Sequence, residues 1–339
     1  MRFVKPRTIA TTSIALLLAS GTASVAFAQA FVPPKGEGSV SFLFQDVAVK
    51  DHYYGTTPVD NGQIRTEVAL FDVSYGLTDR MAISVGLPLV AAKYSGAVPH
   101  PLVDLSGPTP KFYGANPLDN GDYHPTLQDL RFSVRYNITR KNYWLTPFVG
   151  SVVPSHNYEY FAHAAPGIRL NEIQLGISAA KLLDAAVPGL LIQGTFSYGI
   201  VGQVLDFTPN RFNMDLEVGY FLTPKFRVMG LSTGQIVQDG IDIMPNPRLN
   251  LPALEYMHHD QISIDNSLNL GAGAAFSLNE RVDLYGSLIH TVAKRNGHAI
   301  DHGVTMGLTW SFSTANSKDR MIASAEHSLT KCVCEKGTK

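Results

Sequence analysis

Apolar and small polar residues alternate strictly along the stretch from Gly303 to Phe312. Its even-numbered side chains are all large and apolar: Val304, Met306, Leu308, Trp310 and Phe312. A period of two predicts a β-strand with one apolar and one polar face. In a soluble β-sandwich the apolar face would cover a core, whereas in an outer-membrane barrel it would face lipid.

The same alternation recurs along the chain and predicts twelve strands. It is clearest in residues 129–138 and 211–220. The expected strands are residues 39–49, 63–77, 81–87, 129–138, 143–153, 171–182, 190–200, 211–220, 226–233, 261–278, 281–291 and 303–312. In the second strand the alternation changes parity at residues 69–71, which predicts either a β-bulge or a shifted register there.

Short and long connections alternate between these strands. The short ones are residues 78–79, 139–142, 183–189, 223–225 and 279–280, and the long ones are residues 50–62, 93–125, 154–170, 201–210, 234–260 and 292–301. An even-stranded barrel with short periplasmic turns and longer outer loops requires this order. We therefore predict an all-β fold, a closed antiparallel transmembrane β-barrel of about 12 strands with both termini periplasmic. A large secreted β-sandwich or solenoid is the alternative.

The first residues resemble an export signal. A basic start is followed by a short apolar run, and Ala26-Phe27-Ala28 offers small residues for signal peptidase. We predict a cleaved signal peptide over residues 1–28, an outer-membrane barrel over 29–312, and a periplasmic, disordered tail over 313–339; an uncleaved anchor is the alternative for the first segment. Loss of the three basic signal residues shifts the formal net charge from −1 to −4, which argues against a nucleic-acid partner.

Charged residues make up 16% of the chain, below the roughly 25% of soluble proteins. The two cysteines, Cys332 and Cys334, both lie in the tail, so no disulfide framework is expected in the barrel. Within the tail this pair would form a disulfide, cross-link a partner or bind metal, unless the extension is dispensable. These features favour the outer membrane of a Gram-negative bacterium as the location.

Two short motifs resemble those of the outer-membrane transporter family named for the putative meta-pathway of phenol degradation. The first is Tyr75-Gly76-Leu77-Thr78-Asp79-Arg80 leading into a strand that ends in Gly86-Leu87-Pro88, and the second is Glu217-Val218-Gly219-Tyr220 before a turn. The resemblance extends over residues 36–312. It implies outer-membrane transport, with small aromatic or other hydrophobic compounds as solutes. The tail after Phe312 departs from the family pattern.

Charged residues on the polar strand faces are the candidate lumen or selectivity residues. They are Asp129, Arg131, Arg135, Glu172, Arg211, Asp215 and Glu217. Rows of opposite charge in one lumen would orient polar solutes and tune ion selectivity. Alternatively, the same groups pair across neighbouring strands and stiffen the wall.

Histidines concentrate in the expected long loops and the adjoining strand ends. The densest group is His258, His259 and Asp260, where imidazoles beside a carboxylate are a candidate metal site for Zn²⁺ or Cu²⁺. Long polar loops also collect histidines without any such role.

Catalytic motifs are missing from the sequence. It contains no His-x-Ser, Gly-x-Ser-x-Gly or His-Glu-x-x-His, so neither an enzyme nor a cofactor is expected. We expect a channel or transporter for small solutes, whose partners are outer-membrane lipid, the solute, and the barrel assembly machinery that would read Phe312. The alternative is a plugged structural or adhesive barrel whose loops, chiefly 93–125 and 234–260, fold inward or bind other molecules.

Overall fold

The computed structural model describes residues 15–17, 24–26, 30–139 and 143–314. The predicted signal peptide lies outside them except for β1 (Ala15–Leu17) and β2 (Ser24–Ala26), which pair with each other. The predicted tail lies outside them from residue 315 onward, Cys332 and Cys334 included. Among the described residues, no helix is long and apolar enough to cross a membrane.

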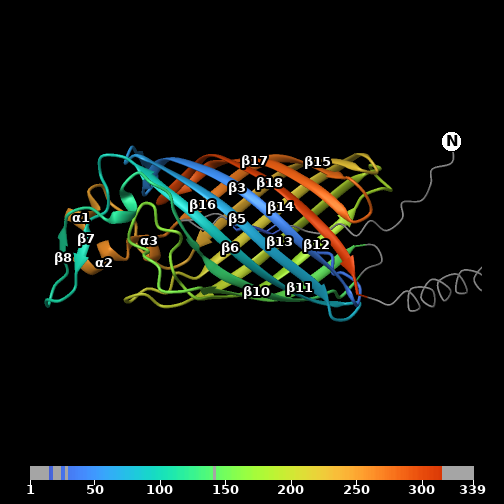
Figure 1. Cartoon of the computed structure of the whole chain (residues 1–339), viewed down its shortest axis with the longest axis horizontal. Helices are drawn as coiled ribbons and strands as arrows, with labels where there is room; N and C mark the ends of the chain where they lie inside the picture. Colours follow the sequence, from blue (N-terminus) through green and yellow to red (C-terminus); the bar gives the residue numbers. More distant parts are fainter. Residues whose placement is uncertain (1–14, 18–23, 27–29, 140–142, 315–339) are drawn as a thin grey trace, which may run out of the picture.

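Twelve antiparallel strands form one closed barrel (Figure 1). They are β3 (Glu37–Tyr54), β5 (Gln63–Gly76), β6 (Met81–Ser95), β10 (Asp129–Tyr136), β11 (Trp144–Pro154), β12 (Glu172–Leu182), β13 (Leu190–Val201), β14 (Arg211–Thr223), β15 (Phe226–Val237), β16 (Asn266–Ser277), β17 (Val282–Arg295) and β18 (Gly297–Ser313). The last strand, β18, pairs with the first, β3, and β6 pairs with β10. The predicted closed antiparallel barrel of about 12 strands is confirmed, as is its closure by the last strand.

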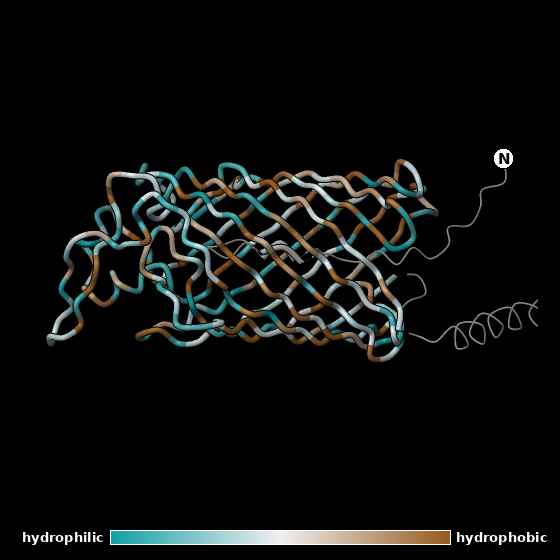
Figure 2. The backbone as a smooth tube through the Cα atoms, in the orientation of Figure 1, coloured by the Kyte–Doolittle hydropathy of each residue, from teal (hydrophilic) through white to brown (hydrophobic). Residues whose placement is uncertain are grey.

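The outward face of the barrel is apolar. Along β18, Met306, Leu308 and Trp310 are exposed, whereas Thr305 and Thr309 on the other face are buried. The same alternation runs around the ring, and further exposed apolar side chains are Phe42, Phe71, Leu87, Phe132, Val149, Leu175, Phe196, Leu216, Leu270 and Leu288. In Figure 2, hydrophobic positions recur along the strands throughout the barrel. Exposed apolar residues over a closed sheet form the lipid-facing surface of a membrane barrel, which we call the membrane band.

The short connections lie at one end of the barrel, the turn end, and the long loops lie at the other, the loop end (Figure 1). The loops carry β4 (Thr57–Val59), β7 (Leu102–Asp104), β8 (Lys111–Tyr113), η1 (Pro117–Asp119), β9 (His124–Leu127), α1 (Pro247–Asn250), α2 (Ala253–Met257) and α3 (His259–Ile262). The β7–β8 hairpin, α1 and α2 project beyond the barrel. The predicted alternation of connections therefore holds, apart from the last loop. Part of the expected turn at residues 139–142 lies outside the described residues.

Several expectations about strand ends are wrong, and β6, for example, continues to Ser95 rather than ending at residue 87. Residues 292–301 were expected to form a loop, but β17 and β18 continue through them and only Asn296 separates the two strands. Asn296 has a positive φ of 56°, which asparagine tolerates in a tight turn. The tenth strand was expected to begin at Gln261, but that residue belongs to α3 and β16 begins at Asn266.

The β-bulge expected at residues 69–71 is not there. The register of β5 runs without interruption against both β3 and β6. Even-numbered side chains of β5 face inward over its whole length, from Ile64 to Ser74. What changes along the strand is the kind of residue on each face, because Arg65 and Glu67 occupy the outward face near the loop end.

Both ends of the described barrel chain meet at the turn end. The amide of Thr314 donates to the carbonyl of Gly36, at 2.7 Å. Just before β3, Ala30 is fully buried and its carbonyl accepts a hydrogen bond from the inward-facing Thr146 hydroxyl, at 2.6 Å. The segment before β3 therefore packs against the inner wall at this end.

Candidate functional site

The seven predicted lumen residues all face the barrel interior. Six of them are buried, and Arg131 is half-buried on the same face of β10 as Arg135, because the alternate residues of that strand point outward. The candidate functional site is therefore the inner wall together with the loop of residues 155–171, which folds over it.

The two arginines of β10 face an aspartate that sequence reasoning did not select. Asp72 of β5 is buried beside them, on the far side of Gly86 of β6. A Cβ added to Gly86 would lie 3.5 Å from both the Arg131 Cβ and the Asp72 Oδ2, so this glycine leaves the wall open between the two side chains. Arg135 donates through Nη2 to the hydroxyls of Ser74 and Ser84, at 2.6 and 3.0 Å. The parity of β5, read without a bulge, would have identified Asp72.

Two carboxylates pair with arginines along the wall. Glu172 of β12 lies 3.3 Å from Arg211 of β14. The strand between them, β13, carries Gly199, where a Cβ would lie 2.3 Å from Glu172 Oε1, so this glycine leaves room for the Glu172 carboxylate in its present position. Glu172 and Arg211 thus form an ion pair across one intervening strand, whereas the pairing expected from the sequence was between neighbouring strands.

Glu217 forms the second pair, with Arg227 of β15, at 2.8 Å. Its other oxygen accepts from Gln193 Nε2, also at 2.8 Å. Arg227 was not selected from the sequence because it lies next to a turn, outside the clear alternation. Asp215, by contrast, lies in register between Thr195 and Thr233.

Apolar side chains gather on the opposite side of the inner wall. A buried cluster joins strands β3, β5, β15 and β17 and includes Leu43, Leu70, Met229, Leu231 and Tyr285. The charged groups, by contrast, lie mainly on β10, β12 and β14. The interior is therefore divided into a charged sector and an apolar sector.

Residues 155–171, which we call the inward loop, fold into the mouth of the barrel. Residues 160–167 are all buried, and Ala164 packs into the apolar wall cluster. The Tyr158 hydroxyl donates to Asp129 Oδ1 at 2.5 Å, and Gln128 Nε2 donates to the Pro166 carbonyl at 2.6 Å. These contacts fix the loop to the wall, so Asp129 positions the loop.

The neighbouring loops cover the inward loop from outside. Tyr160 and Phe161 pack with Tyr256 and Met257 of α2, and Phe112 of β8 borders the same cluster. In the alternative of a plugged or adhesive barrel, loops 93–125 and 234–260 fold inward or bind other molecules. In the structure parts of both loops project beyond the barrel, and both pack over the inward loop.

Asp119 of η1 ties the inward loop to the first covering loop. Its carboxylate accepts from the backbone amides of His163 and Ala164, at 3.2 and 2.9 Å. Burial raises the pKa of Asp119, but hydrogen bonds from His100 and the Ala164 amide outweigh that effect, and the pKa lies below its ordinary value. Asp119 is thus held as a carboxylate inside the loop cluster.

The structure divides the predicted metal group. His258 lies against the Tyr160 hydroxyl, 3.2 Å from its Nδ1, and does not converge with the other two residues. His259 Nε2 lies 3.4 Å from Asp260 Oδ1, and the His100 ring from another loop joins them, with candidate ligand atoms within 4.8 Å of one another. His259 Nδ1 lies 2.7 Å from the Tyr256 carbonyl, and burial lowers the pKa of His259.

No known family model matches the chain, and no curated protein matches it in sequence. The fold is similar to that of an outer-membrane channel from Pseudomonas putida F1, with a TM-score of 0.61 over 84% of this chain and 98% of that one, at 14% identity. The translocator domain of the autotransporter NalP from Neisseria meningitidis covers 83% of this chain and 90% of its own, at 12% identity and a TM-score of 0.46. The CymD monoaromatic hydrocarbon channel covers 86% and 92%, at 10% identity and a TM-score of 0.44.

The last two likenesses are too distant to support an argument, and the first establishes the fold. The closed barrel and its apolar outward face define the class of the protein, an outer-membrane β-barrel protein. More particularly, it is a twelve-stranded barrel of the fold seen in the Pseudomonas putida channel.

Proposed function

We propose that this protein is an outer-membrane channel for small solutes. The observation that carries the proposal is the division of residues across the wall. Buried charged groups such as Arg135 and Asp215 face the interior, while apolar residues face outward. A polar inner surface inside a closed barrel is the arrangement that conducts water-soluble compounds across an outer membrane.

The inner wall favours solutes with an apolar body and a charged group. Leu43, Met229 and Tyr285 belong to the buried apolar sector, and the half-buried Arg131 on another sector offers a cationic group. A small aromatic acid that enters between the two sectors would contact both at once. Aromatic compounds are also the solutes implied by the resemblance to the phenol-degradation transporter family, and we retain that resemblance as part of the proposal.

The inward loop would set the width of the path. It meets the wall through Asp129 and Ala164 and narrows the mouth at the loop end. The loop therefore favours slow, selective passage over the passage of a wide general porin.

Conductance and uptake test the proposal directly. Purified full-length protein in planar bilayers is expected to show discrete conductance steps, and liposomes containing it are expected to swell faster with benzoate than with a neutral sugar of similar size. Impermeability to ions and to both solutes would contradict the channel assignment. Equal swelling rates for the two solutes would contradict the aromatic-acid preference alone.

The inward loop also favours a second candidate, a barrel plugged at the loop end. Replacing residues 159–167 by a short Gly-Ser linker separates the two functions. A rise from no conductance to a large conductance would identify a plug. A moderate rise from a measurable conductance would identify a constriction within a channel. Adhesion that falls in the same variant, with conductance unchanged, would identify the loops as a contact surface.

A further inference from the structure

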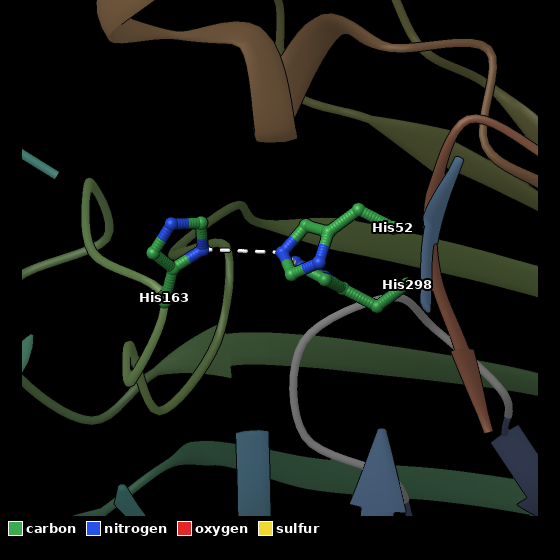
Figure 3. A group of neighbouring side chains, drawn as sticks. All are labelled: His52, His163 and His298. Carbon is green, nitrogen blue, oxygen red and sulfur yellow. Dashed lines mark hydrogen bonds between the residues drawn. The ribbon is translucent and has the colours of Figure 1, made fainter. Parts of the chain in front are cut away.

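Three histidines from distant parts of the chain converge at the loop end. His52 lies near the end of β3, His163 lies in the inward loop, and His298 lies at the start of β18 (Figure 3). His52 Nε2 is 3.2 Å from His163 Nδ1 and 2.7 Å from His298 Nε2. All three side chains are buried, with exposed fractions of 6%, 6% and 9%.

Hydrogen bonds among the rings leave the three facing nitrogens, His52 Nε2, His163 Nδ1 and His298 Nε2, incompletely satisfied. His163 Nε2 donates to the Val98 carbonyl at 3.0 Å, which leaves a lone pair on Nδ1 directed at His52. Burial lowers the pKa of His163 well below its ordinary value, so this ring is neutral. A neutral ring nitrogen offers either one proton or one lone pair, so His52 Nε2 forms a well-aligned hydrogen bond with only one of its two neighbours. A cation between the rings would accept the lone pairs of all three.

The geometry points to a metal site: we propose that His52, His163 and His298 together bind a divalent transition metal of the zinc type. Zinc binds imidazole nitrogens at about 2.0–2.1 Å, so two ligand atoms of a tetrahedral ion lie about 3.3 Å apart. The His52–His163 separation of 3.2 Å fits this value, and the His52–His298 separation of 2.7 Å would widen on binding. The Val98 carbonyl supplies the outer hydrogen bond that commonly orients a metal-bound histidine.

The proposed ion would fasten the inward loop to the closing seam of the barrel. His298 and His52 are register partners on β18 and β3, the strands that close the ring. His163 is the contribution of the loop, so metal binding would join the loop to both strands at once. Metal binding favours the state that presents all three ligands, so it stabilises the inward position of the loop.

Two neighbouring sets compete for the assignment. His100, His259 and Asp260 place candidate ligand atoms within 4.8 Å of one another, and so do His100, Asp119 and His163, a set that shares His163 with the proposed site. His163→Ala alone therefore does not separate the sets. His298→Gln changes the proposed site alone, and His259→Ala changes the set with Asp260 alone.

Metal binding is measured on the full-length protein, purified without a histidine tag, folded in detergent and stripped with a chelator. Titration with Zn²⁺ by calorimetry is expected to show one tight equivalent, and Co²⁺ is expected to give the intense visible absorption of a tetrahedral site. His163→Ala is expected to weaken Zn²⁺ binding by about 100-fold. Removing a residue that only hydrogen-bonds to a metal ligand already costs about 10–100-fold in metal affinity, and loss of a ligand should cost at least as much. The matched control is His302→Ala, which removes an exposed histidine from the same strand as His298.

Three results would overturn the proposal: unchanged affinity in either His163→Ala or His298→Gln, loss of affinity in His259→Ala but not in His163→Ala, or only weak binding that His302→Ala reduces equally. His298→Gln preserves side-chain bulk and serves as a second ligand variant, and the heat-dependent gel mobility of the barrel confirms that each variant is folded. None of these measurements depends on conduction, so a metal site would stand even if the channel proposal failed. If both hold, Zn²⁺ is expected to lower conductance in the wild type, reversibly with chelator, and to leave His163→Ala unchanged.

Discussion

The two halves of strand β5 have opposite chemistry on the same faces. In the membrane band, Phe71 points outward and Asp72 points inward, as in a lipid-exposed barrel. Toward the loop end, Arg65 points outward and Ile64 and Val68 are buried inside. The strand keeps one register throughout, so no bulge exchanges its faces. The reversal of apolar and polar faces instead follows from what surrounds each half of the strand.

Strands β3, β5 and β6 are longer than the 9–11 residues that cross a membrane. Their excess residues at the loop end, 46–54, 63–68 and 90–95, form what we call the loop-end extension, and it behaves like a soluble β-sheet. Outside, Arg65 pairs with Asp46. Inside, Val68 packs on Val90, and Ile64 and Tyr94 belong to the same buried cluster as Ala164 of the inward loop. Water outside and packed loops inside reverse the pattern that lipid outside and a polar interior impose.

The largest effect is expected from a charge placed in the band. Phe71→Arg puts a cation on the lipid-facing side near the middle of β5, and it is expected to destabilise the barrel by about 2–4 kcal/mol, the cost of arginine at the bilayer midplane. The check is reversible urea unfolding in lipid vesicles, followed by tryptophan fluorescence.

Glu67→Arg is its matched control, because it lies on the same face of the same strand but in the extension. Its expected change in unfolding free energy is within about 0.5 kcal/mol, the range of ordinary surface substitutions. Equal destabilisation by the two variants would mean that the membrane covers the extension as well.

A smaller effect is expected from crowding the wall of the band. A Cβ added to Gly271 of β16 would lie 2.3 Å from the backbone carbonyl of Leu288, whereas one added to Gly230 of β15 meets nothing within 4 Å. Gly271→Val is therefore expected to cost about 1–3 kcal/mol through overpacking. Gly230→Val, the control, is expected to be neutral, and the same unfolding assay compares the two.

The strands and their order were predictable because alternation and turn residues are local signals. Met306, Leu308 and Trp310 face outward as predicted, and β18 closes the barrel against β3. The parity change in β5 was misread because a period of two indicates two faces but does not identify which solvent each face meets. A bulge and a change of surroundings leave the same trace in one sequence.

The sequence allowed the candidate site to be predicted only as a set of inward-facing positions. Charged residues such as Glu172 and Arg211 were assigned to the inner face from parity alone, whereas their contact across Gly199 of an intervening strand is visible only in the folded barrel. His52, His163 and His298 are far apart in the sequence and meet only when the barrel closes and the inward loop folds in. Their concentration in loops and strand ends was visible, whereas their convergence was not.

A weaker test addresses how the covering loops are held to the extension. Asp242 in loop 238–265 accepts two hydrogen bonds from Arg295, at 2.8 and 2.6 Å, and both side chains are nearly half exposed. An exposed pair of this kind contributes about 1 kcal/mol or less. Asp242→Asn is therefore expected to increase proteolysis of this loop only a few-fold at neutral pH.

The pH dependence of that effect follows from the pKa of Asp242. Hydrogen bonds from Arg295 lower the pKa in the folded protein, below the unfolded value of about 3.9. The contribution to stability is thus fully present above pH 4 and is lost as the pH falls through the folded pKa. Wild type and Asp242→Asn are expected to differ at pH 7 and to converge as the pH falls below the folded pKa of Asp242. A difference that does not shrink with falling pH would assign the effect to packing.

The smallest expected effect concerns ion selectivity. The test compares an arginine on the inner face of the barrel with an arginine on the outer face of the extension. Arg131 faces the lumen, and two unit charges about 10 Å apart in water interact by about 0.4 kcal/mol, which corresponds to about a twofold change in relative permeability. Arg131→Gln is expected to shift the reversal potential toward cation selectivity by that amount in a salt gradient.

Arg65→Gln also removes one positive charge, but from the outward face, where half of the side chain is exposed. It is expected to leave the reversal potential unchanged, since bulk salt screens an exposed charge within about 10 Å. Equal shifts from the two arginines would show that permeating ions respond to net charge alone, and the division between inner and outer faces would then have no part in selectivity.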